Sequence, residues 1–274
     1  MDLKSYVDSE LEEEKELGYS PSGVSGSDGD GYPGSDDVYV PESDVDAETI
    51  RFTANGAEQS AYLVRPKGGG SAPLVIVIHE NKGLVPYIKN VARRLAAEGY
   101  VAVAPDLLAR VGGTDKFDGG EAAIAAIRDL DPQGMVEDVR ATLTEVSGRD
   151  GVDADKAGII GFCFGGGVAW RVLTQEPRLS AGVPFYGPTP DEEAVPDITA
   201  PVLGIYGELD ERITSMLPGI REAMETHGKE FGAVVLPDAG HAFHNDTNPD
   251  RYNPEAAAKA WRTAVDFLDD TIKS

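Results

Sequence analysis

The chain has 274 residues, of which 48 are acidic and 24 are basic, so its formal net charge is −24 at pH 7. This balance argues against nucleic acids and anionic membrane surfaces as partners, because both carry negative charge. A single cysteine cannot form an internal disulfide bond, and a lone thiol is typical of a reducing compartment. No apolar run is long enough to span a bilayer, and residues 1–16 lack the features of a secretory signal. We therefore predict a soluble, cytoplasmic protein.

The N-terminal region is the most acidic part of the chain. Residues 1–49 contain 15 acidic residues and 2 lysines, and Gly, Ser and Asp dominate residues 20–37. This composition is typical of a flexible segment. We predict that residues 1–45 form a flexible acidic extension and that residues 46–274 form one domain. The acidity fits an interaction tail or a protein that works in high salt, and the sequence leaves both open.

The first predicted elements are a β-hairpin over residues 50–53 and 61–65, with Asn55-Gly56 as its turn. The apolar run at residues 74–78 is typical of a strand that is buried on both faces of a sheet. A helix over residues 86–97 and a strand over residues 100–104 follow. The remaining chain alternates in the same way, with helices over residues 121–128, 135–146, 168–174, 218–227 and 254–272 and strands over 158–160, 181–185, 202–206 and 233–236. This alternation predicts an α/β fold with a mostly parallel, twisted sheet and helices on both faces.

The segment Gly161-Phe-Cys-Phe-Gly165 lies between a predicted strand and a predicted helix. It has the pattern of a nucleophile elbow, with Cys163 in place of the usual serine. The glycines are needed because a Cβ two residues before or after the nucleophile would collide with the neighbouring backbone. The helix N-terminus that follows favours a thiolate. A buried cysteine that only packs is the simpler alternative.

The ends of three predicted strands deliver Cys163, Asp210 and His241 in that order. Parallel strands present their carboxyl ends at one edge of the sheet, where ligands bind. Nucleophile, acid and histidine in this order are typical of α/β-hydrolases. We expect His241 to take the thiol proton and Asp210 to orient the imidazole. Glu208 and Glu211 are alternatives for the acid, and His244 is an alternative for His241.

An acyl-transfer site also needs two backbone N–H donors for the oxyanion. We expect one donor from Phe164, directly after the nucleophile, and the other from Asn81, in the loop after residues 74–78. We expect His79 either to line the pocket or to be packed in the core, and His244 to contact substrate or the rim of the site.

Five segments together resemble the dienelactone hydrolase family, also called carboxymethylenebutenolidases. They are Val75-Ile-Val-Ile-His-Glu80, Tyr100-Val-Ala-Val-Ala-Pro-Asp-Leu-Leu-Ala-Arg110, Gly161-Phe-Cys-Phe-Gly-Gly166, Tyr206-Gly-Glu-Leu-Asp210 and Ala239-Gly-His-Ala-Phe243. The resemblance implies an α/β-hydrolase fold and a triad of Cys163, His241 and Asp210. It also implies that Glu80 lies beside the cysteine and controls its protonation. The implied reaction is hydrolysis of an ester or enol-lactone through a thioester, without a metal or cofactor.

One position departs from the family pattern. The family's enzymes for dienelactone hold the substrate carboxylate with an arginine four residues after the catalytic histidine, and this chain has Asn245 there. An amide cannot replace the bidentate grip of an arginine on a carboxylate. We therefore expect a small-molecule ester or lactone substrate of open identity, with Asn245 as a substrate contact. A non-catalytic binding or redox-sensing protein with a reactive cysteine is the alternative function. The oligomeric state stays open.

Overall fold

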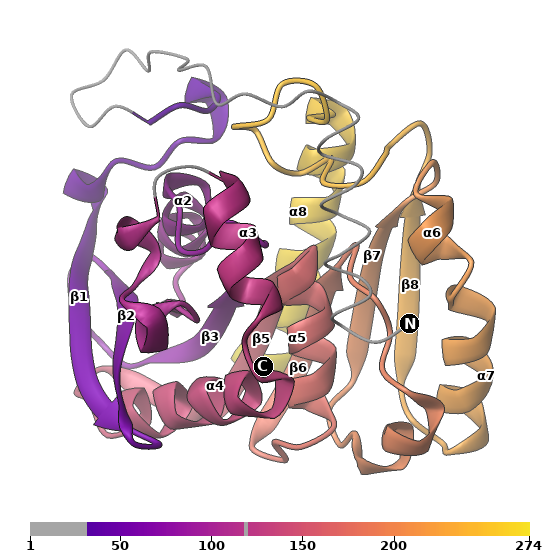
Figure 1. The fold of residues 1–274 in the computed structure, drawn as a ribbon, viewed down its shortest axis with the longest axis horizontal. Coiled ribbons are helices and arrows are strands. Elements are labelled where there is room, and N and C mark those ends of the chain that lie inside the picture. Colours follow the sequence, from indigo (N-terminus) through magenta and orange to yellow (C-terminus); the bar gives the residue numbers. More distant parts are fainter. Residues whose placement is uncertain (1–31, 118–119) are drawn as a thin grey trace.

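The computed structural model describes residues 32–117 and 120–274 and contains one eight-stranded sheet with the order β1-β2-β4-β3-β5-β6-β7-β8 (Figure 1). The strands are β1 Val45–Ala54, β2 Ala57–Pro66, β3 Ala72–Ile78, β4 Val101–Pro105, β5 Val152–Phe162, β6 Leu179–Phe185, β7 Val202–Gly207 and β8 Phe231–Leu236. In this sheet β2 runs opposite to the other seven strands, so its pairings with β1 and β4 are antiparallel and all the other pairings are parallel. The predicted α/β class with a mostly parallel sheet is confirmed.

The hairpin of β1 and β2 turns at the predicted dipeptide. Asn55 and Gly56 have φ angles of 52° and 74°, and Ala54 pairs with Ala57. Two residues with positive φ form the tight turn that matches the twist of a hairpin. Both strands extend further than the apolar pattern indicated, because the outer strand β1 is largely exposed and therefore carries a weak hydrophobic signal.

The helices are α2 Pro86–Ala97, α3 Gly120–Arg128, α4 Pro132–Ser147, α5 Phe164–Leu173, α6 Glu211–Thr214, α7 Leu217–Thr226 and α8 Pro254–Leu268. Proline stands at the start of α2, α4 and α8, where its missing N–H costs no hydrogen bond. The side chains of Asp131 and Asn253 cap the N-termini of α4 and α8. The short helix α6 was not predicted, because four residues show no helical periodicity.

Helices cover both faces of the sheet, which encloses the central strands. A Cβ on Gly158 of β5 would approach Leu268 of α8, whereas a Cβ on Gly182 of the neighbouring strand would collide with Leu173 of α5. Gly158 pairs with Ala181, so Gly158 and Gly182 face opposite sides of the sheet. The helices α8 and α5 therefore lie on opposite faces. Residues 74–78 of β3 are completely buried between these layers, as the continuous apolar run predicted.

The segment before β1 packs on the domain. Tyr32 is buried, and short 3₁₀ turns form at Asp36–Val38 and Glu42–Asp44. The Asn90 side chain in α2 accepts a hydrogen bond from Val40 N–H and donates one to the Val38 carbonyl. The proposed boundary at residues 45 and 46 stays a prediction, and residues 1–31 of the predicted extension lie outside the described residues.

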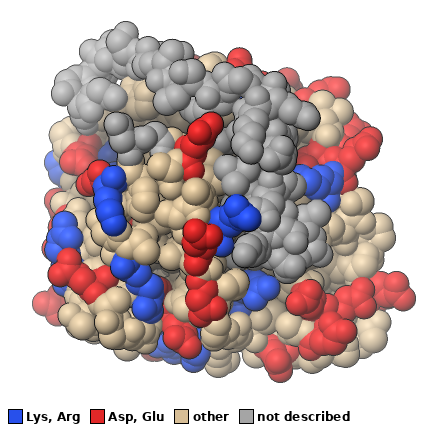
Figure 2. Space-filling model, viewed as in Figure 1, with Lys and Arg blue, Asp and Glu red and all other residues tan. Residues whose placement is uncertain are grey.

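Acidic side chains gather at the lower right of the face drawn in Figure 2, where Figure 1 places α7. Basic side chains are spread between acidic ones over the rest of that face. None of the helices within residues 32–117 and 120–274 is both long and apolar enough to cross a membrane. The cytoplasmic location stays a prediction.

Candidate active site

Cys163 lies at the turn between β5 and α5. Its φ and ψ angles are 57° and −121°, a backbone conformation that L-residues rarely adopt, and only 3% of the residue is exposed. Its N–H donates to the carbonyl of Phe185 at 3.1 Å, and its carbonyl accepts from the N–H of Gly166 at 2.9 Å. These bonds fix a strained turn that places the thiol at the N-terminus of a helix.

The two glycines that flank the cysteine are required by close backbone packing. A Cβ on Gly161 would collide with the carbonyl of Gly165. A Cβ on Gly165 would collide with the carbonyls of Ile78 and His79 at the end of β3. The elbow therefore depends on glycine at both positions, as the sequence pattern indicated.

Asp210 and His241 form a short, buried pair. His241 Nδ1 lies 2.6 Å from Asp210 Oδ2, and each side chain is 4% exposed. The backbone ties the two loops together, since Leu209 N–H donates to the carbonyl of Ala239 at 2.9 Å. In this pair the imidazole places its Nδ1–H on the carboxylate, which leaves Nε2 to accept a proton.

Tyr186 connects this pair to the elbow. Its ring meets the ring of His241 edge to face at 5.2 Å. Tyr186 directly follows Phe185, whose carbonyl binds the N–H of Cys163. His241 and Cys163 thus contact two adjacent residues at the end of β6.

Backbone strain is concentrated around these strand ends. Among the described residues, five that are not glycine have a positive φ, and four of them are Cys163 at 57°, Tyr186 at 35°, Asp238 at 56° and Ala242 at 58°. Asp238 and Ala242 flank His241. Conformations of this kind persist where the surrounding structure fixes them, and they cluster at functional sites.

Glu80 lies at the end of β3, beside the elbow. Ile78 pairs with Gly161 across β3 and β5, so Glu80 and Cys163 each stand two residues beyond a paired position. Asn245 Nδ2 donates a 2.6 Å hydrogen bond to Glu80 Oε2, and both residues are buried. Glu80, expected to control the protonation of the cysteine, is therefore hydrogen-bonded to Asn245, expected to contact substrate.

One predicted oxyanion donor, Phe164, lies in the elbow, and the other, Asn81, lies in the loop after β3. Phe164 is the first residue of α5, so its N–H has no acceptor within the helix. Asn81 directly follows Glu80 and is buried. Its side-chain Nδ2 has no hydrogen-bond partner within the described part of the chain. A buried donor without a partner is costly in free energy, and a ligand that accepts a hydrogen bond would recover part of that cost.

His79 is completely buried and uses both ring nitrogens on the backbone. Its Nε2 accepts from Leu107 N–H at 3.1 Å, so Nδ1 carries the proton and donates to the Glu80 carbonyl at 2.6 Å. Burial lowers the pKa of His79 and keeps the imidazole neutral. These contacts join the ends of β3 and β4 beneath the site.

His244 is also buried, between the rings of Phe162 and Trp261. Its Nδ1 lies 2.7 Å from Tyr87 Oη, and its Nε2 lies 3.5 Å from Arg94 Nη1. Burial, followed by the charge of Arg94, lowers the pKa of His244 well below its usual value. The side chain is thus a neutral part of an aromatic cluster, and a contact of His79, His244 or Asn245 with substrate stays a prediction.

The sequence model of the dienelactone hydrolase family matches residues 59–272, which includes every residue of this site. The chain belongs to the dienelactone hydrolase family.

Relatives and solved structures agree with this assignment. A protein of Methylorubrum extorquens described as "Putative carboxymethylenebutenolidase" is 35% identical over 220 residues, which cover 76% of this chain and 75% of that protein. A "Probable 2-oxo-3-(5-oxofuran-2-ylidene)propanoate lactonase" of Bradyrhizobium is 34% identical over 231 residues, or 80% of this chain and 92% of that protein. The crystal structure titled "Putative Dienelactone Hydrolase" from Klebsiella pneumoniae gives a TM-score of 0.75 at 30% identity, covering 82% of this chain and 98% of that one.

The predicted α/β-hydrolase fold and the predicted hydrolase class are both confirmed by membership of the dienelactone hydrolase family. Family membership favours a hydrolase over the alternative of a non-catalytic binding or sensing protein. The cysteine chemistry and the roles of the individual residues stay predictions.

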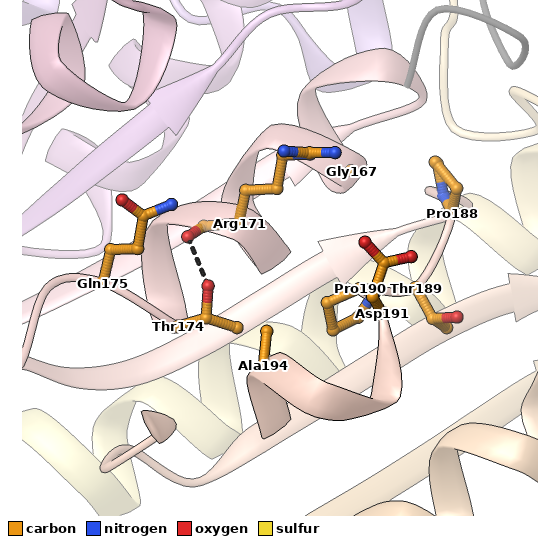
Figure 3. Close-up of a pocket in the computed structure, with 9 residues that line it drawn as sticks. All are labelled: Gly167, Arg171, Thr174, Gln175, Pro188, Thr189, Pro190, Asp191 and Ala194. Carbon is orange, nitrogen blue, oxygen red and sulfur yellow. Dashed lines mark hydrogen bonds between the residues drawn. The ribbon is translucent and has the colours of Figure 1, made fainter. Parts of the chain in front are cut away.

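A small separate pocket of about 100 Å³ lies on the outer side of α5 (Figure 3). Figure 3 shows the hydrogen bond that Thr174 Oγ1 donates to the Arg171 carbonyl, which is 2.8 Å long. The pocket is lined by Gly167, Arg171, Thr174, Gln175, Pro188, Thr189, Pro190, Asp191 and Ala194. None of the residues expected to carry the chemistry of a dienelactone hydrolase lines it, so it is not part of the candidate active site.

Proposed function

We propose that the chain hydrolyses small-molecule esters or enol-lactones through a thioester on Cys163, with His241 and Asp210 completing a triad. The observation that carries this proposal is the 2.6 Å contact of His241 Nδ1 with Asp210 Oδ2, on loops next to the strained elbow of Cys163. The names of the relatives as carboxymethylenebutenolidase and lactonase support the substrate class.

In the first step His241 takes the proton of the Cys163 thiol, and the resulting thiolate attacks the carbonyl carbon of the substrate. The N–H groups of Phe164 and Asn81 stabilise the negative charge that develops on the carbonyl oxygen. The carbon–oxygen bond to the leaving group then breaks, and His241 gives its proton to the departing oxygen. In a lactone the leaving oxygen stays attached to the acyl group, so the ring opens without release of a fragment.

In the second step water replaces the leaving group. His241 takes a proton from the water, whose oxygen attacks the thioester carbon. The carbon–sulfur bond breaks, and the sulfur takes the proton back from His241. Asp210 stabilises the imidazolium in both steps without being protonated itself. The products are a carboxylic acid and the free thiol.

Glu80 is proposed to control the protonation of the cysteine. It stands level with Cys163 at the neighbouring strand end, and its carboxylate is held by Asn245. A carboxylate next to a thiol disfavours the thiolate until substrate arrives, and this limits oxidation of the resting enzyme. Glu80 therefore acts on the nucleophile rather than on the substrate.

The test is hydrolysis of a chromogenic short-chain ester and of an enol-lactone by the purified full chain. We expect turnover by the natural sequence and no turnover by Cys163→Ala. We also expect a hydroxylamine-sensitive mass increase on the peptide that contains Cys163 when a slow ester is used. Alkylation of the thiol before the assay should reduce turnover in proportion to the fraction of thiol that is blocked.

The proposal is contradicted if the natural sequence turns over neither the ester nor the lactone. It is also contradicted if Cys163→Ala hydrolyses as fast as the natural sequence. The variant Arg171→Gln is the matched control, because Arg171 lines the separate pocket of Figure 3 and should leave turnover unchanged.

A further inference from the structure

The N-terminal segment, residues 32–35, encloses the carboxylate of Asp246. Tyr32 Oη donates to both carboxylate oxygens at 2.8 and 2.9 Å, and Ser35 N–H donates to Oδ2 at 2.8 Å. In Figure 1 the indigo start of the described chain lies beside the yellow loop between β8 and α8. Two parts of the chain more than 200 residues apart are thus joined by three hydrogen bonds.

The contact is buried and closely fitted. Tyr32 is 5% exposed and Asp246 is 7% exposed. A Cβ on Gly34 would collide with the Asp246 carboxylate, so only glycine lets the segment pass at this distance. Burial raises the pKa of Asp246, whereas the hydrogen bonds from Tyr32 and Ser35 and the charge of Arg94 act in the opposite direction. The Tyr32 hydroxyl and the Ser35 N–H therefore stabilise a carboxylate that would otherwise be costly to bury.

The segment itself is fixed to α2. The Tyr32 ring stacks on Tyr39 at 4.8 Å, and the Arg93 guanidinium lies 5.3 Å from the centre of the Tyr39 ring. Asn90 of the same helix binds the backbone of Val38 and Val40. Residues 32–40 consequently provide a firm support for Asp246.

Asp246 belongs to the loop that carries His241, the proposed general base. This loop, residues 237–253, is called the β8–α8 loop. Asp246 directly follows Asn245, whose amide holds Glu80, and it comes five residues after His241. A shift of Asp246 would move its neighbour Asn245 and, through it, the carboxylate of Glu80. Tyr32 and Ser35 lie outside residues 59–272, which the sequence model of the family matches.

We propose that Tyr32 and Ser35 are positioning residues for the reaction: by binding Asp246 they hold the β8–α8 loop so that His241 stays on Asp210 and Asn245 stays on Glu80. This inference rests on the proposed function. It makes the segment before the hydrolase domain a part of the catalytic apparatus. An error of about 1 Å in the placement of a reacting group can lower a rate by up to about 100-fold. The effect should fall on the chemical step, because the loop acts on the nucleophile.

The experiment compares Tyr32→Phe with Tyr62→Phe in the full chain. Each variant loses one hydroxyl that joins the N-terminal segment to the domain, since Tyr62 Oη donates to Glu42 Oε1 at 2.7 Å on β2, away from the loop. We expect Tyr32→Phe to lower kcat on the ester by about 10-fold with little change in KM. We expect Tyr62→Phe to keep kcat within about twofold of the natural sequence, at a similar melting temperature. Gly34→Ala should reproduce the effect of Tyr32→Phe, because its methyl group displaces the segment.

A second measurement separates this inference from the proposed function. The rate of alkylation of Cys163 by iodoacetamide, measured from about pH 6 to pH 9, reports the placement of Glu80 without any turnover. If the natural sequence hydrolyses neither ester nor lactone, the proposed function is wrong, and the inference then depends on this rate alone. A severalfold difference in rate between Tyr32→Phe and Tyr62→Phe supports it. Equal kcat values and equal alkylation rates for these two variants would overturn it.

Discussion

The amide of Asn245 is fixed on the carboxylate of Glu80. Asn245 Oδ1 accepts hydrogen bonds from the N–H and the hydroxyl of Thr247 at 3.0 and 2.7 Å, so its Nδ2 must face Glu80, at 2.6 Å from Oε2. The amide is a neutral donor, and it stabilises the glutamate less than an arginine would. Asn245 therefore supports Glu80 in this structure, and its contact with substrate stays a prediction.

The first prediction concerns the charge at position 245. Asn245→Asp places a second carboxylate against Glu80, and two buried carboxylates at this distance cannot both ionise at low cost. The two carboxylates therefore share a proton, and the pKa of one of them is higher in the folded protein than in the unfolded chain. The resulting loss of stability is absent at about pH 4 and grows as the pH rises through the raised value.

The measurement is the melting temperature of Asn245→Asp and of Asn245→Ala between about pH 4 and pH 7. The alanine variant loses the hydrogen bond without adding a charge, so it is the matched control. The two variants should have similar melting temperatures at low pH. Toward neutral pH the melting temperature of the aspartate variant should fall below that of the alanine variant. A constant difference across the range would show that Glu80 does not face position 245.

The second prediction concerns the identity of the triad acid. Asp210→Asn leaves the contact with His241 but favours the wrong tautomer of the imidazole, so kcat should fall by about 10²- to 10⁴-fold while the melting temperature changes little. Glu208→Gln and Glu211→Gln remove the two neighbouring carboxylates and should keep kcat within about twofold. If kcat falls further in Glu208→Gln than in Asp210→Asn, then Glu208 is the acid of the triad.

Much of the fold and site could be predicted because the signals are local. Residues 86–97 form a helix as the apolar periodicity indicated, and Cys163, Asp210 and His241 follow strands that could be recognised from their apolar runs. The rule that parallel strands end at one edge then predicts that the three side chains lie close together, and the structure pairs two of them, Asp210 and His241. The partners of buried polar side chains could not be predicted in this way, since they depend on how distant elements pack.

His244 and Tyr32 show what the sequence did not reveal. His244 stands three residues after His241, and the sequence does not show that its ring is enclosed by aromatic side chains from three other segments. Tyr32 lies in a stretch of Gly, Asp and Ser, whose composition is typical of a flexible chain, although its buried hydroxyl binds Asp246. In both cases the decisive contact comes from a residue far away in the sequence.

The third prediction concerns the glycines of the elbow. Gly165→Ala should lower the free energy of unfolding by about 3 kcal/mol or more and prevent alkylation of the native thiol, because its methyl group would collide with the carbonyls of Ile78 and His79. Gly240→Ala is the matched control next to His241, since its Cβ would meet nothing within 4 Å. We expect its stability to stay within about 1 kcal/mol of the natural sequence. Equal destabilisation of the two variants, measured by urea unfolding, would argue against a tightly packed elbow.

The last prediction follows from the buried, neutral His244. Burial, with a further contribution from the charge of Arg94, lowers its pKa well below the usual value of 6.5 in the native state. Below about pH 6.5 the unfolded chain binds a proton that the folded chain does not, so the folded state loses stability as the pH falls. The loss amounts to about 1.4 kcal/mol per pH unit until the lowered pKa is reached.

His244→Gln removes this titration while its amide can still donate to Tyr87 and accept from Arg94. Urea unfolding at about pH 7.5, 6.5 and 5.5 measures both proteins. The variant should be the less stable protein at the highest pH, because it loses the ring contacts. The difference in the free energy of unfolding between the two proteins should narrow by about 1.4 kcal/mol per pH unit below pH 6.5. If the difference does not change with pH, the imidazole is not held neutral, and the aromatic cluster beneath the elbow must admit its charged form.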